Sequence, residues 1–544
     1  MADENRTLIE TFLPVEDISE EAKKEKAGRA PTFEMHYWWT RKPLVTARAA
    51  VLGALLSSDY DITEFKRLLG LGMEKRAHNF DINPAQLEKL RQEYLKVWGT
   101  ENPLVLDPFA GGGSIPFEAM RVGVDAISND YNPVAHLIQK ATLEYPRKYG
   151  EKLYKDVKKG LEWVFEETKK ELESYYPMHD GLPAAAYIWA WMVRCPKCGF
   201  DNPLVGQWWL VRNEKNNVYM QPSVVGGKLN VEIKNGTDVP EGTCTGGDGK
   251  CLSCGSIIQN SAVKKDIVER EEERLLAVVL TKSKGKEYVL PSKEDFDGFQ
   301  KAKEEVTLNW DKWLKDNLIP LEEMPEDTRG SISAKLYLKY WYKLLNPRQQ
   351  LLFVTLLKKM KEYARIVSNK HDSEFGEAVA SYISFILGKH IDYNCRSTTW
   401  IRSKELISST TGRRGSAMMW DHAEVNPFVK GSGTLISVNN AILVGLKYSM
   451  DRLIDRGNIR VMIGSITSLK ESVNILVTDP PYFDDVRYAE FSEFFYVWER
   501  KALEGFHDLG DVQSQKICLS AAAIEPENFS KNYSNSPASA CMIA

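Results

Sequence analysis

The strongest constraint on the fold is a short apolar run that ends in an acidic residue and a glycine cluster. Residues 104–106 (LVL) are followed by Asp107-Pro108 and by three glycines at 111–113. An apolar run that stops at turn residues predicts a buried strand, a tight turn and the start of a helix. Because glycine adopts positive φ and leaves backbone N–H groups accessible, such a turn suits a nucleotide-like ligand. A strand, turn and helix without a ligand is the alternative.

A second short strand is predicted at residues 124–128, just before Asp130. In doubly wound α/β folds, an acidic residue about 20 positions after the glycine turn holds a ribose diol. The turn contains no Walker A lysine, so a bound nucleoside is favoured over phosphoryl transfer. An ordinary carboxylate that caps the helix beginning near Asn132-Pro133 explains Asp130 equally well.

The third feature is the sequence Asp479-Pro480-Pro481-Tyr482, which follows the apolar run 475–477. Two prolines fix φ and remove two backbone donors, so carbonyl oxygens and the Asp479 carboxylate remain as acceptors. Acceptors beside an aromatic ring suit a planar amine, such as the exocyclic amino group of a flipped base stacked on Tyr482. The alternative is a proline-terminated edge strand whose aspartate is satisfied within its own turn.

Three segments together resemble the S-adenosylmethionine-dependent amino-methyltransferases that modify N6 of adenine or N4 of cytosine in DNA. They are HYWWTRKPLVTARA (36–49), DPFAGGGSIPFEA (107–119) and TDPPYFDDVRYAEFSEFFYVW (478–498). More narrowly, the chain resembles the prokaryotic adenine-specific DNA methylases that contain a zinc ribbon and a DUF1156 N-terminal region. Segments 347–357 and 417–428 add to this likeness.

The resemblance implies direct transfer of a sulfonium methyl group to the amine of a flipped DNA base, with adenine N6 favoured. A neutral amine is a poor nucleophile, so alignment and acceptors that stabilise the growing positive charge must provide most of the catalysis. The catalytic residues implied are Asp479, Pro480, Pro481 and Tyr482. S-adenosyl-L-methionine is expected at Asp107, Phe109, Gly111, Gly113, Asp130, Arg41, Lys42 and Pro43. An RNA base methyltransferase, or an inactive or split fragment that binds nucleic acid through a zinc ribbon, is the alternative.

Two cysteine pairs repeat the pattern Cys-x-x-Cys-Gly, at Cys195/Cys198 and at Cys251/Cys254. Eight cysteines in 544 residues are too few for a disulfide framework, and this spacing is typical of zinc knuckles. Four thiolates suit a tetrahedral structural zinc ion, with Cys244 as a substitute ligand. Four unrelated reduced cysteines are the alternative.

Composition limits the choice of partners. The 71 basic and 75 acidic residues give a net charge of −4, which excludes a generally basic coat for nucleic acid, so a DNA surface must be local. The basic and aromatic segment 396–414 is the candidate for phosphate contacts, and a solvated loop is the alternative.

Residues 1–10 lack the pattern of a secretory signal, and no apolar run of about 18 residues occurs. We therefore expect a cytoplasmic protein that does not enter the membrane.

The expected fold class is α/β, a Rossmann-like methyltransferase sheet with a long insertion that contains a zinc ribbon and a helical region. The expected domains are a helical DUF1156-like region with the cofactor-contacting segment (1–100), a methyltransferase core (101–150 and 435–505), a zinc ribbon (186–262), a mainly helical insertion for target recognition (263–434) and an irregular tail (506–544). The resemblance implies further strands after the proline motif, so we expect a C-terminally truncated sheet that a second polypeptide completes.

Overall fold

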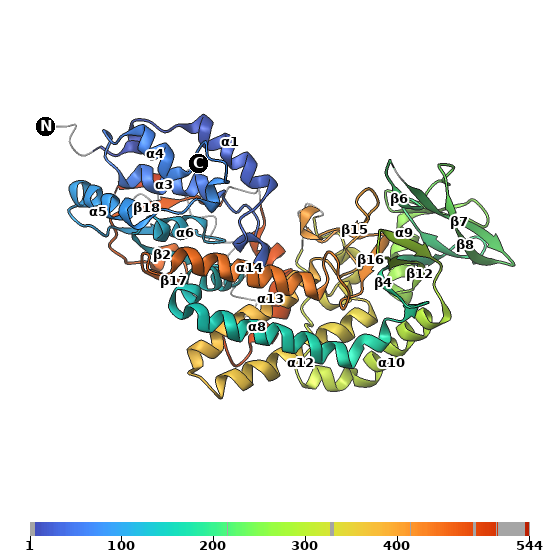
Figure 1. The fold of residues 1–544 in the computed structure, drawn as a ribbon. Helices are drawn as coiled ribbons and strands as arrows, with labels where there is room; N and C mark the ends of the chain where they lie inside the picture. Colours follow the sequence, from blue (N-terminus) through green and yellow to red (C-terminus); the bar gives the residue numbers. More distant parts are fainter. Residues whose placement is uncertain are drawn as a thin grey trace.

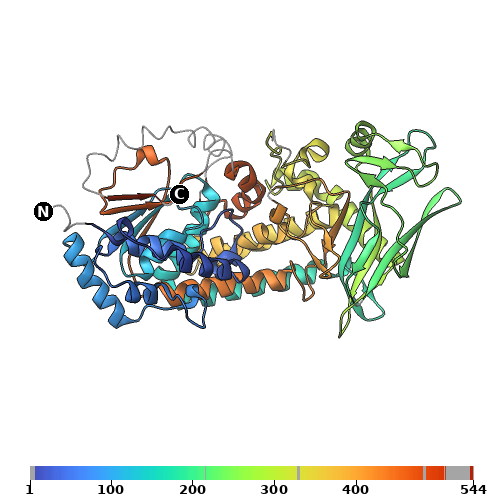
Figure 2. The ribbon, with the colours of Figure 1, turned by 90° about the horizontal axis from the view of Figure 1, so that it is seen from above.

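The computed structural model describes residues 6–214, 216–326, 331–413, 415–481, 486–507, 509 and 539–542. The molecule is elongated, with a parallel-sheet lobe at one end and a lobe rich in antiparallel strands at the other (Figure 1, Figure 2). Long helices run between the two lobes. None of the described helices combines the length and the apolar character needed to cross a bilayer.

Residues 6–100 are mainly helical and pack beside the parallel sheet. The helices are α1 (Val15–Ala27), α2 (Thr32–Met35), α3 (Leu44–Leu55), α4 (Ile62–Leu69) and α5 (Pro84–Trp98), with short 3₁₀ turns η1 (Leu8–Glu10) and η2 (Ala77–Asn79). α3 is the central helix of this group, and almost all of its residues are buried. Its one basic residue, Arg48, is buried in an ion pair with Glu118, with 2.7 Å between Nε and Oε2.

Five parallel strands form the main sheet, in the order β17–β2–β1–β18–β19. The strands are β1 (Leu104–Asp107), β2 (Asp125–Asp130), β17 (Ile459–Ile463), β18 (Ile475–Thr478) and β19 (Ser539–Met542). The short apolar runs that predicted β1, β2 and β18 are therefore confirmed as strands. The helices that follow or precede these strands are α6 (Ser114–Arg121), α7 (Pro133–Gln139), α14 (Leu435–Leu453) and α15 (Tyr488–Leu503), with the 3₁₀ turn η7 (Ile466–Ser468).

β1 and β18 are direct neighbours although they lie far apart in the sequence. Val105 pairs with Ile475 and Leu106 with Leu476. Because the carboxyl ends of parallel strands lie at the same edge of a sheet, the glycine turn and the proline motif begin side by side. The juxtaposition on which the predicted site depends is confirmed.

The tail differs from the expectation of irregular structure over 506–544. Residues 539–542 form β19, which pairs with β18 from Ile475 opposite Ser539 to Thr478 opposite Met542. A central parallel strand exposes N–H and C=O groups on both sides, and β19 satisfies the groups on one side of β18. The sequence SACM has little strand propensity, so tertiary pairing, and not local pattern, makes it a strand.

Long helices connect the two lobes (Figure 1). They are α8 (Tyr145–Leu172), which follows a π-helical turn η3 (Lys140–Glu144), and α12 (Pro347–Ser368), α13 (Ser373–Ile391) and α14. α12 begins at an Asn346 capping box that also uses Gln349. These helices pack on one another and bury a continuous apolar core.

The second lobe, here called the strand-rich lobe (residues 178–289 and 400–425), is built around β4 (Leu182–Arg194). Its main sheet has the order β13–β12–β4–β16, and β3 and β5 also pair with β4. These strands are β3 (Met178–His179), β5 (Asp201–Leu204), β12 (Glu273–Thr281), β13 (Lys286–Val289) and β16 (Asp421–Val425). Smaller sheets contain β6 (Trp209–Arg212), β7 (Asn217–Val225) and β8 (Lys228–Asn235); β9 (Cys244–Thr245), β10 (Asp248–Lys250) and β11 (Ile257–Ile258); and β14 (Trp400–Ile401) and β15 (Leu406–Ile407).

The remaining described helices lie in the chain between the strands of this lobe or next to them. They are η4 (Glu173–Tyr175), α9 (Asn260–Arg270), α10 (Lys293–Lys315), α11 (Lys335–Leu338), η5 (Trp341–Leu344) and η6 (Thr411–Arg413).

The expected boundary between a zinc ribbon ending at 262 and a mainly helical insertion at 263–434 is not seen. β12 and β16, which come from the supposed helical part, flank β4 in one sheet. Residues 275–280 of β12 are all buried, so the strand is a continuous apolar run without alternation. Such a run cannot be distinguished from a buried helix by periodicity alone, so the sequence did not reveal β12. Residues 263–434 are still mainly helical, as expected, through α10, α12 and α13. The fold is nevertheless mixed α/β, as predicted.

Candidate active site

The glycine turn after β1 is fixed to the end of β2 by Asp130. The N–H of Gly111 donates to Asp130 Oδ2 at 2.8 Å, and the N–H of Asn132 donates to Oδ1 at 2.8 Å. Gly111 and Gly113 have φ values of +51° and +78°, which favour glycine. Burial raises the pKa of Asp130 to about 6, although backbone donors oppose this shift. The capping alternative is wrong, because Asn132 is the N-cap of α7.

Asp107 lies at the end of β1 and is buried. Its Oδ1 accepts hydrogen bonds from the Phe109 N–H (3.2 Å) and from the Thr478 hydroxyl (2.9 Å). Burial raises its pKa to about 8; the two hydrogen bonds oppose this, while Asp130 and Asp479 add to it. Within the described part of the chain, neither lysine nor arginine forms an ion pair with this carboxyl group. Asp107 is therefore suited to a ligand that carries a positive charge or a strong donor.

The N-terminal segment 36–42 covers the glycine turn at close range. A Cβ atom at Gly111 would lie 2.7 Å from Trp38 Nε1, and one at Gly112 would lie 2.8 Å from Arg41 Nε. Real Cβ atoms do not approach other atoms so closely, so bare backbone is required at both positions. The segment that was predicted to contact a cofactor therefore meets the turn itself.

Arg41 is buried, and burial lowers its pKa to about 9. Its two terminal nitrogens donate to the carbonyls of Thr32 (3.3 Å) and His36 (3.2 Å). Its Nε has no hydrogen-bond partner among the described residues, and the same holds for Ser114 Oγ and Asn129 Oδ1 nearby. Buried polar atoms without partners cost free energy, on the order of 1–3 kcal/mol each. A polar ligand at the turn would relieve this cost.

Lys42 reaches the proline motif, whereas Arg41 contacts the glycine turn. Its Nζ is 2.8 Å from Asp479 Oδ2, in an ion pair whose side chains are 30% and 15% exposed. Pro43 starts helix α3, since its carbonyl accepts the N–H groups of Thr46 and Ala47 at 3.1 Å. The segment thus bridges the glycine turn and the proline motif.

The proline motif follows β18 directly. Asp479 and Pro480 are half-buried and Pro481 is exposed. Tyr482, the predicted base-stacking residue, lies outside the described residues. Asp479 is therefore placed at the same edge of the sheet as Asp107, and the position of the aromatic ring is not described.

Two aromatic residues that sequence reasoning did not single out close this region. The rings of Trp38 and Tyr488 stack with 5.5 Å between centroids and 21° between planes. Tyr488 Oη also forms a hydrogen bond with Thr40 Oγ1. Both residues lie within segments that carried the family resemblance, but nothing in the local pattern indicated that they would meet.

A buried contact fixes the same N-terminal segment to α15. His36 Nε2 lies 2.7 Å from Glu499 Oε1, and His36 Nδ1 lies 2.7 Å from the carbonyl of Tyr37. Both side chains are fully buried. The N-terminal segment is thus held at Glu499 as well as at Asp479.

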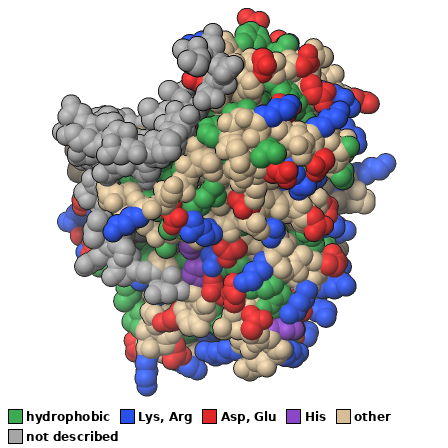
Figure 3. Space-filling model, turned by 90° about the vertical axis from the view of Figure 1, so that its left-hand side faces the viewer, with side chains coloured by type: hydrophobic (Ala, Val, Ile, Leu, Met, Phe, Trp, Pro, Cys, Tyr) green, Lys and Arg blue, Asp and Glu red, His purple; other side chains and the backbone are tan. Residues whose placement is uncertain are grey.

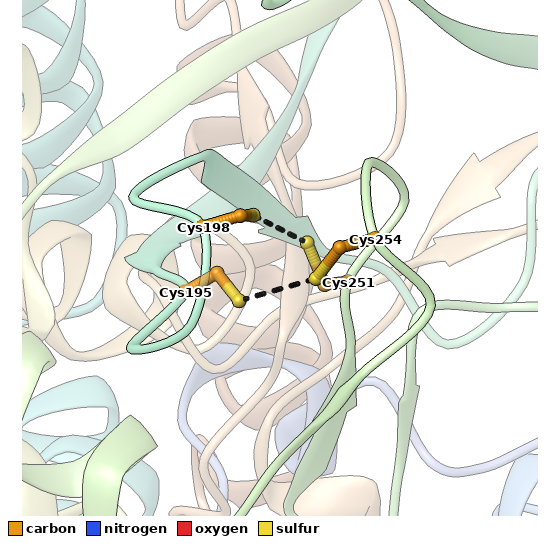
Figure 4. Close-up of side chains that lie close together, drawn as sticks. All are labelled: Cys195, Cys198, Cys251 and Cys254. Atoms are coloured by element: carbon orange, nitrogen blue, oxygen red, sulfur yellow. Dashed lines mark hydrogen bonds between the residues drawn. The ribbon is translucent and has the colours of Figure 1, made fainter.

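The four predicted metal-ligating cysteines converge at one point of the strand-rich lobe (Figure 4). Cys195 Sγ lies 3.8 Å from Cys254 Sγ, Cys198 Sγ lies 3.6 Å from Cys251 Sγ, and all four sulfurs lie within 4.8 Å of one another. The two knuckles repeat one turn: the N–H groups of Gly199 and Gly255 donate to the carbonyls of the first cysteines at 2.9 Å. Cys244 is not part of this cluster.

Arg396 and Arg402, two of the basic residues in segment 396–414, are held in ion pairs. Arg396 is buried and bonds to both oxygens of Glu273, at 3.1 and 2.8 Å. Arg402 pairs with Asp421 at 3.1 Å, and Arg414 lies outside the described residues. Figure 3 views the molecule from the end of the parallel-sheet lobe, and on that face too positive and negative side chains are interspersed. Because Arg396 is buried and paired, it is not available to contact phosphate. It is also not part of a solvated loop, which was the alternative.

Two family models match the chain. A model described as a protein of unknown function, DUF1156, matches residues 12–70, and a model of D12 class N6 adenine-specific DNA methyltransferases matches residues 89–220. The first match contains the segment that covers the glycine turn, and the second contains the turn, Asp107 and Asp130. No curated protein and no solved structure matches the chain.

Proposed function

We propose that this chain, an N6-adenine-specific DNA methyltransferase by its D12-class domain, performs methyl transfer at the carboxyl ends of β1, β2 and β18. The observation that carries this proposal is the parallel pairing of β1 with β18. It brings Asp107, beside the glycine turn, and Asp479, at the proline motif, to one edge of a Rossmann-like sheet.

The residues around the glycine turn fit S-adenosyl-L-methionine. When bound, the cofactor supplies a methyl group on a positively charged sulfur. Asp107 offers Oδ2 to a cationic group, because both of its described hydrogen bonds end on Oδ1. Arg41 offers its Nε, which has no partner among the described residues, to an acceptor. Asp130 pins the turn, and the left-handed Gly111 and Gly113 keep the backbone bare. Phe109 contributes through its N–H to Asp107.

Asp479 acts as the acceptor for the amine of the target base. Lys42 fixes the orientation of its carboxylate through Oδ2. The carboxylate and the Pro480 carbonyl accept the amine hydrogens and stabilise the positive charge that grows on nitrogen during transfer. Pro480 and Pro481 keep the backbone rigid, and Tyr482 is proposed to stack on the base. Trp38 and Tyr488 shield the site from water.

The four cysteines are proposed to hold a structural zinc ion in a ribbon within the strand-rich lobe. A zinc–sulfur distance of about 2.3 Å implies sulfur–sulfur distances of about 3.8 Å in a tetrahedron, and the observed 3.6 and 3.8 Å agree. Four thiolates leave no open position for catalysis. We propose that this lobe contributes to target recognition on DNA, in the cytoplasm.

The zinc proposal predicts one zinc ion per chain in protein purified without chelators. Cys198→Ser and Cys254→Ser should each lower the zinc content by at least about half and lower the melting temperature, because three thiolates bind zinc more weakly. Cys244→Ser is the matched control and should keep the full zinc content. Equal loss in all three variants, or no zinc in the wild type, would contradict the assignment.

The function is tested by incubating the protein with labelled S-adenosylmethionine and either DNA or RNA. Label should appear in DNA, as N6-methyladenine in a nuclease digest. Asp479→Asn should lower the rate by about 10²–10³-fold while cofactor binding persists. Asp451→Asn, at an exposed aspartate paired with Lys447 on α14, is the control. Label in RNA alone, or a cofactor-binding protein that labels neither polymer, would contradict the proposal.

A further inference from the structure

One hydrogen bond joins the two halves of the proposed site across the centre of the sheet. Thr478 Oγ1, at the end of β18, donates to Asp107 Oδ1, at the end of β1, at 2.9 Å. The two residues are separated by 371 positions in the sequence, and both are buried. Thr478 directly precedes Asp479, so one peptide unit and one hydrogen bond connect the acceptor to the carboxyl group beside the glycine turn.

We propose that Thr478 is a positioning residue for the cofactor. Its hydroxyl orients the Asp107 carboxyl group and favours the ionised form of that group. Oδ2 is then free to accept the cationic amine of S-adenosylmethionine. The inference rests on the proposed function, because it takes the ligand of Asp107 to be this cofactor.

The surroundings of Asp107 show why a second donor matters. The carboxyl group receives only two hydrogen bonds from described residues, from Phe109 and Thr478. Two further carboxyl groups, Asp130 and Asp479, disfavour its charge. With both donors present the pKa is still raised to about 8. Removal of the Thr478 hydroxyl must raise the pKa of Asp107 further. Ionisation of the carboxyl group near neutral pH would then cost more free energy when a cationic ligand binds.

The strand itself does not require a hydroxyl at position 478. The preceding residues Ile475, Leu476 and Val477 are all buried and apolar, and valine has the size and strand propensity of threonine. The hydroxyl makes no other described hydrogen bond than the one to Asp107. If residue 478 had only a structural role, valine would fill it equally well.

The test compares Thr478→Val and Thr478→Ser with the wild type in binding S-adenosylhomocysteine, which carries the same amine. Calorimetry at pH 6.5 to 9.5 gives the dissociation constant without measuring turnover. At pH 7, Thr478→Val should bind about tenfold more weakly, as expected for a lost hydrogen bond to a charged group. The deficit should shrink towards pH 9.5, where the carboxyl group ionises without help. Thr478→Ser should bind within about threefold of the wild type.

A matched control is Thr168→Val on α8, since Thr168 is fully buried and its hydroxyl has no described partner. It should leave binding unchanged. In an Asp107→Asn background, Thr478→Val should have no further effect. Thr478→Ala replaces Thr478→Val if the valine variant does not fold. In kinetics, the KM for the cofactor should rise more than kcat falls.

Three results would overturn the inference: normal binding by Thr478→Val at pH 7, a deficit that is equal at all pH values, or no recovery in Thr478→Ser. Each would leave the proposed function intact. A wild-type protein that neither binds the cofactor nor methylates DNA would instead contradict the proposed function.

Discussion

Carboxyl groups are buried both at the edge of the parallel sheet and in the core of the strand-rich lobe. In the described part of the chain, only those in the strand-rich lobe are paired with buried arginine side chains. In the core of the strand-rich lobe, both oxygens of Glu424 accept hydrogen bonds from Arg348 of α12, at 2.7 and 3.0 Å, and both oxygens of Glu273 accept hydrogen bonds from Arg396. Burial alone would raise the pKa of Glu273, yet Arg396 and His422 bring it down to about 2. At the sheet edge, burial raises the pKa of Asp107 to about 8.

This difference separates groups that support the fold from groups that await a ligand. A buried carboxylate with a bidentate arginine is complete, so its role is structural. A buried carboxyl group that has only hydroxyl and N–H donors gains from a cation that arrives with the ligand. The same reasoning applies to Arg41 Nε, which lies at the glycine turn and has no hydrogen-bond partner in the part of the chain that the structure describes.

The largest expected effect comes from breaking a complete pair. Arg348→Ala leaves Glu424 buried with Trp189 and Asn346 as its remaining described donors, so the free energy of unfolding should fall by about 3–5 kcal/mol. Urea unfolding measures this change. Lys447→Ala, which removes an exposed ion pair with Asp451 on α14, should change stability by less than about 0.5 kcal/mol. Equal effects would show that Glu424 does not depend on its arginine.

An effect of opposite sign is expected for Asp107→Asn in the absence of cofactor. The pKa of about 8 in the folded protein exceeds the unfolded value of about 3.9, so the folded state retains a proton that the unfolded state releases. The contribution of Asp107 to the free energy of unfolding is therefore fully present below about pH 4 and is lost as the pH rises through 8. Asparagine does not titrate. The variant should melt a few degrees above the wild type at pH 8 and should lose this advantage at pH 4.

The same variant should also fail to bind the cofactor. A protein that is more stable but no longer binds its ligand would separate Asp107 clearly from the structural carboxyl groups. Scanning calorimetry gives the melting temperatures, and titration with S-adenosylhomocysteine gives the affinity. A variant that is less stable than the wild type at pH 8 would show that Asp107 is a structural group like Glu424.

The smallest effect is expected for Tyr488→Phe. The substitution keeps the stacking on Trp38 but removes the hydrogen bond to Thr40. The loss of one such bond at a partly exposed site should slow methylation by about two- to tenfold. Steady-state kinetics measures this, with Tyr149→Phe as control, since Tyr149 Oη makes no described hydrogen bond. A loss of more than about 100-fold would place Tyr488 in contact with substrate.

Local patterns allowed part of this molecule to be predicted. The runs before Asp107 and Asp479 are strands, and the two Cys-x-x-Cys-Gly turns have the same hydrogen bonds. In each case the residues that carry the signal lie within a few positions of one another. Sequence reasoning failed for β12, whose burial on both faces removes alternation, and for Arg396, which is buried against Glu273.

The sequence by itself determined the strand ends, the glycine turn, the proline motif and the cysteine knuckles, because short-range sterics and residue chemistry specify them. Only the tertiary structure decided that Lys42 meets Asp479, that Thr478 meets Asp107, and that β19 pairs with β18. These contacts join positions hundreds of residues apart or depend on an open strand edge, and local sequence carries no information about which distant groups the folded chain brings together.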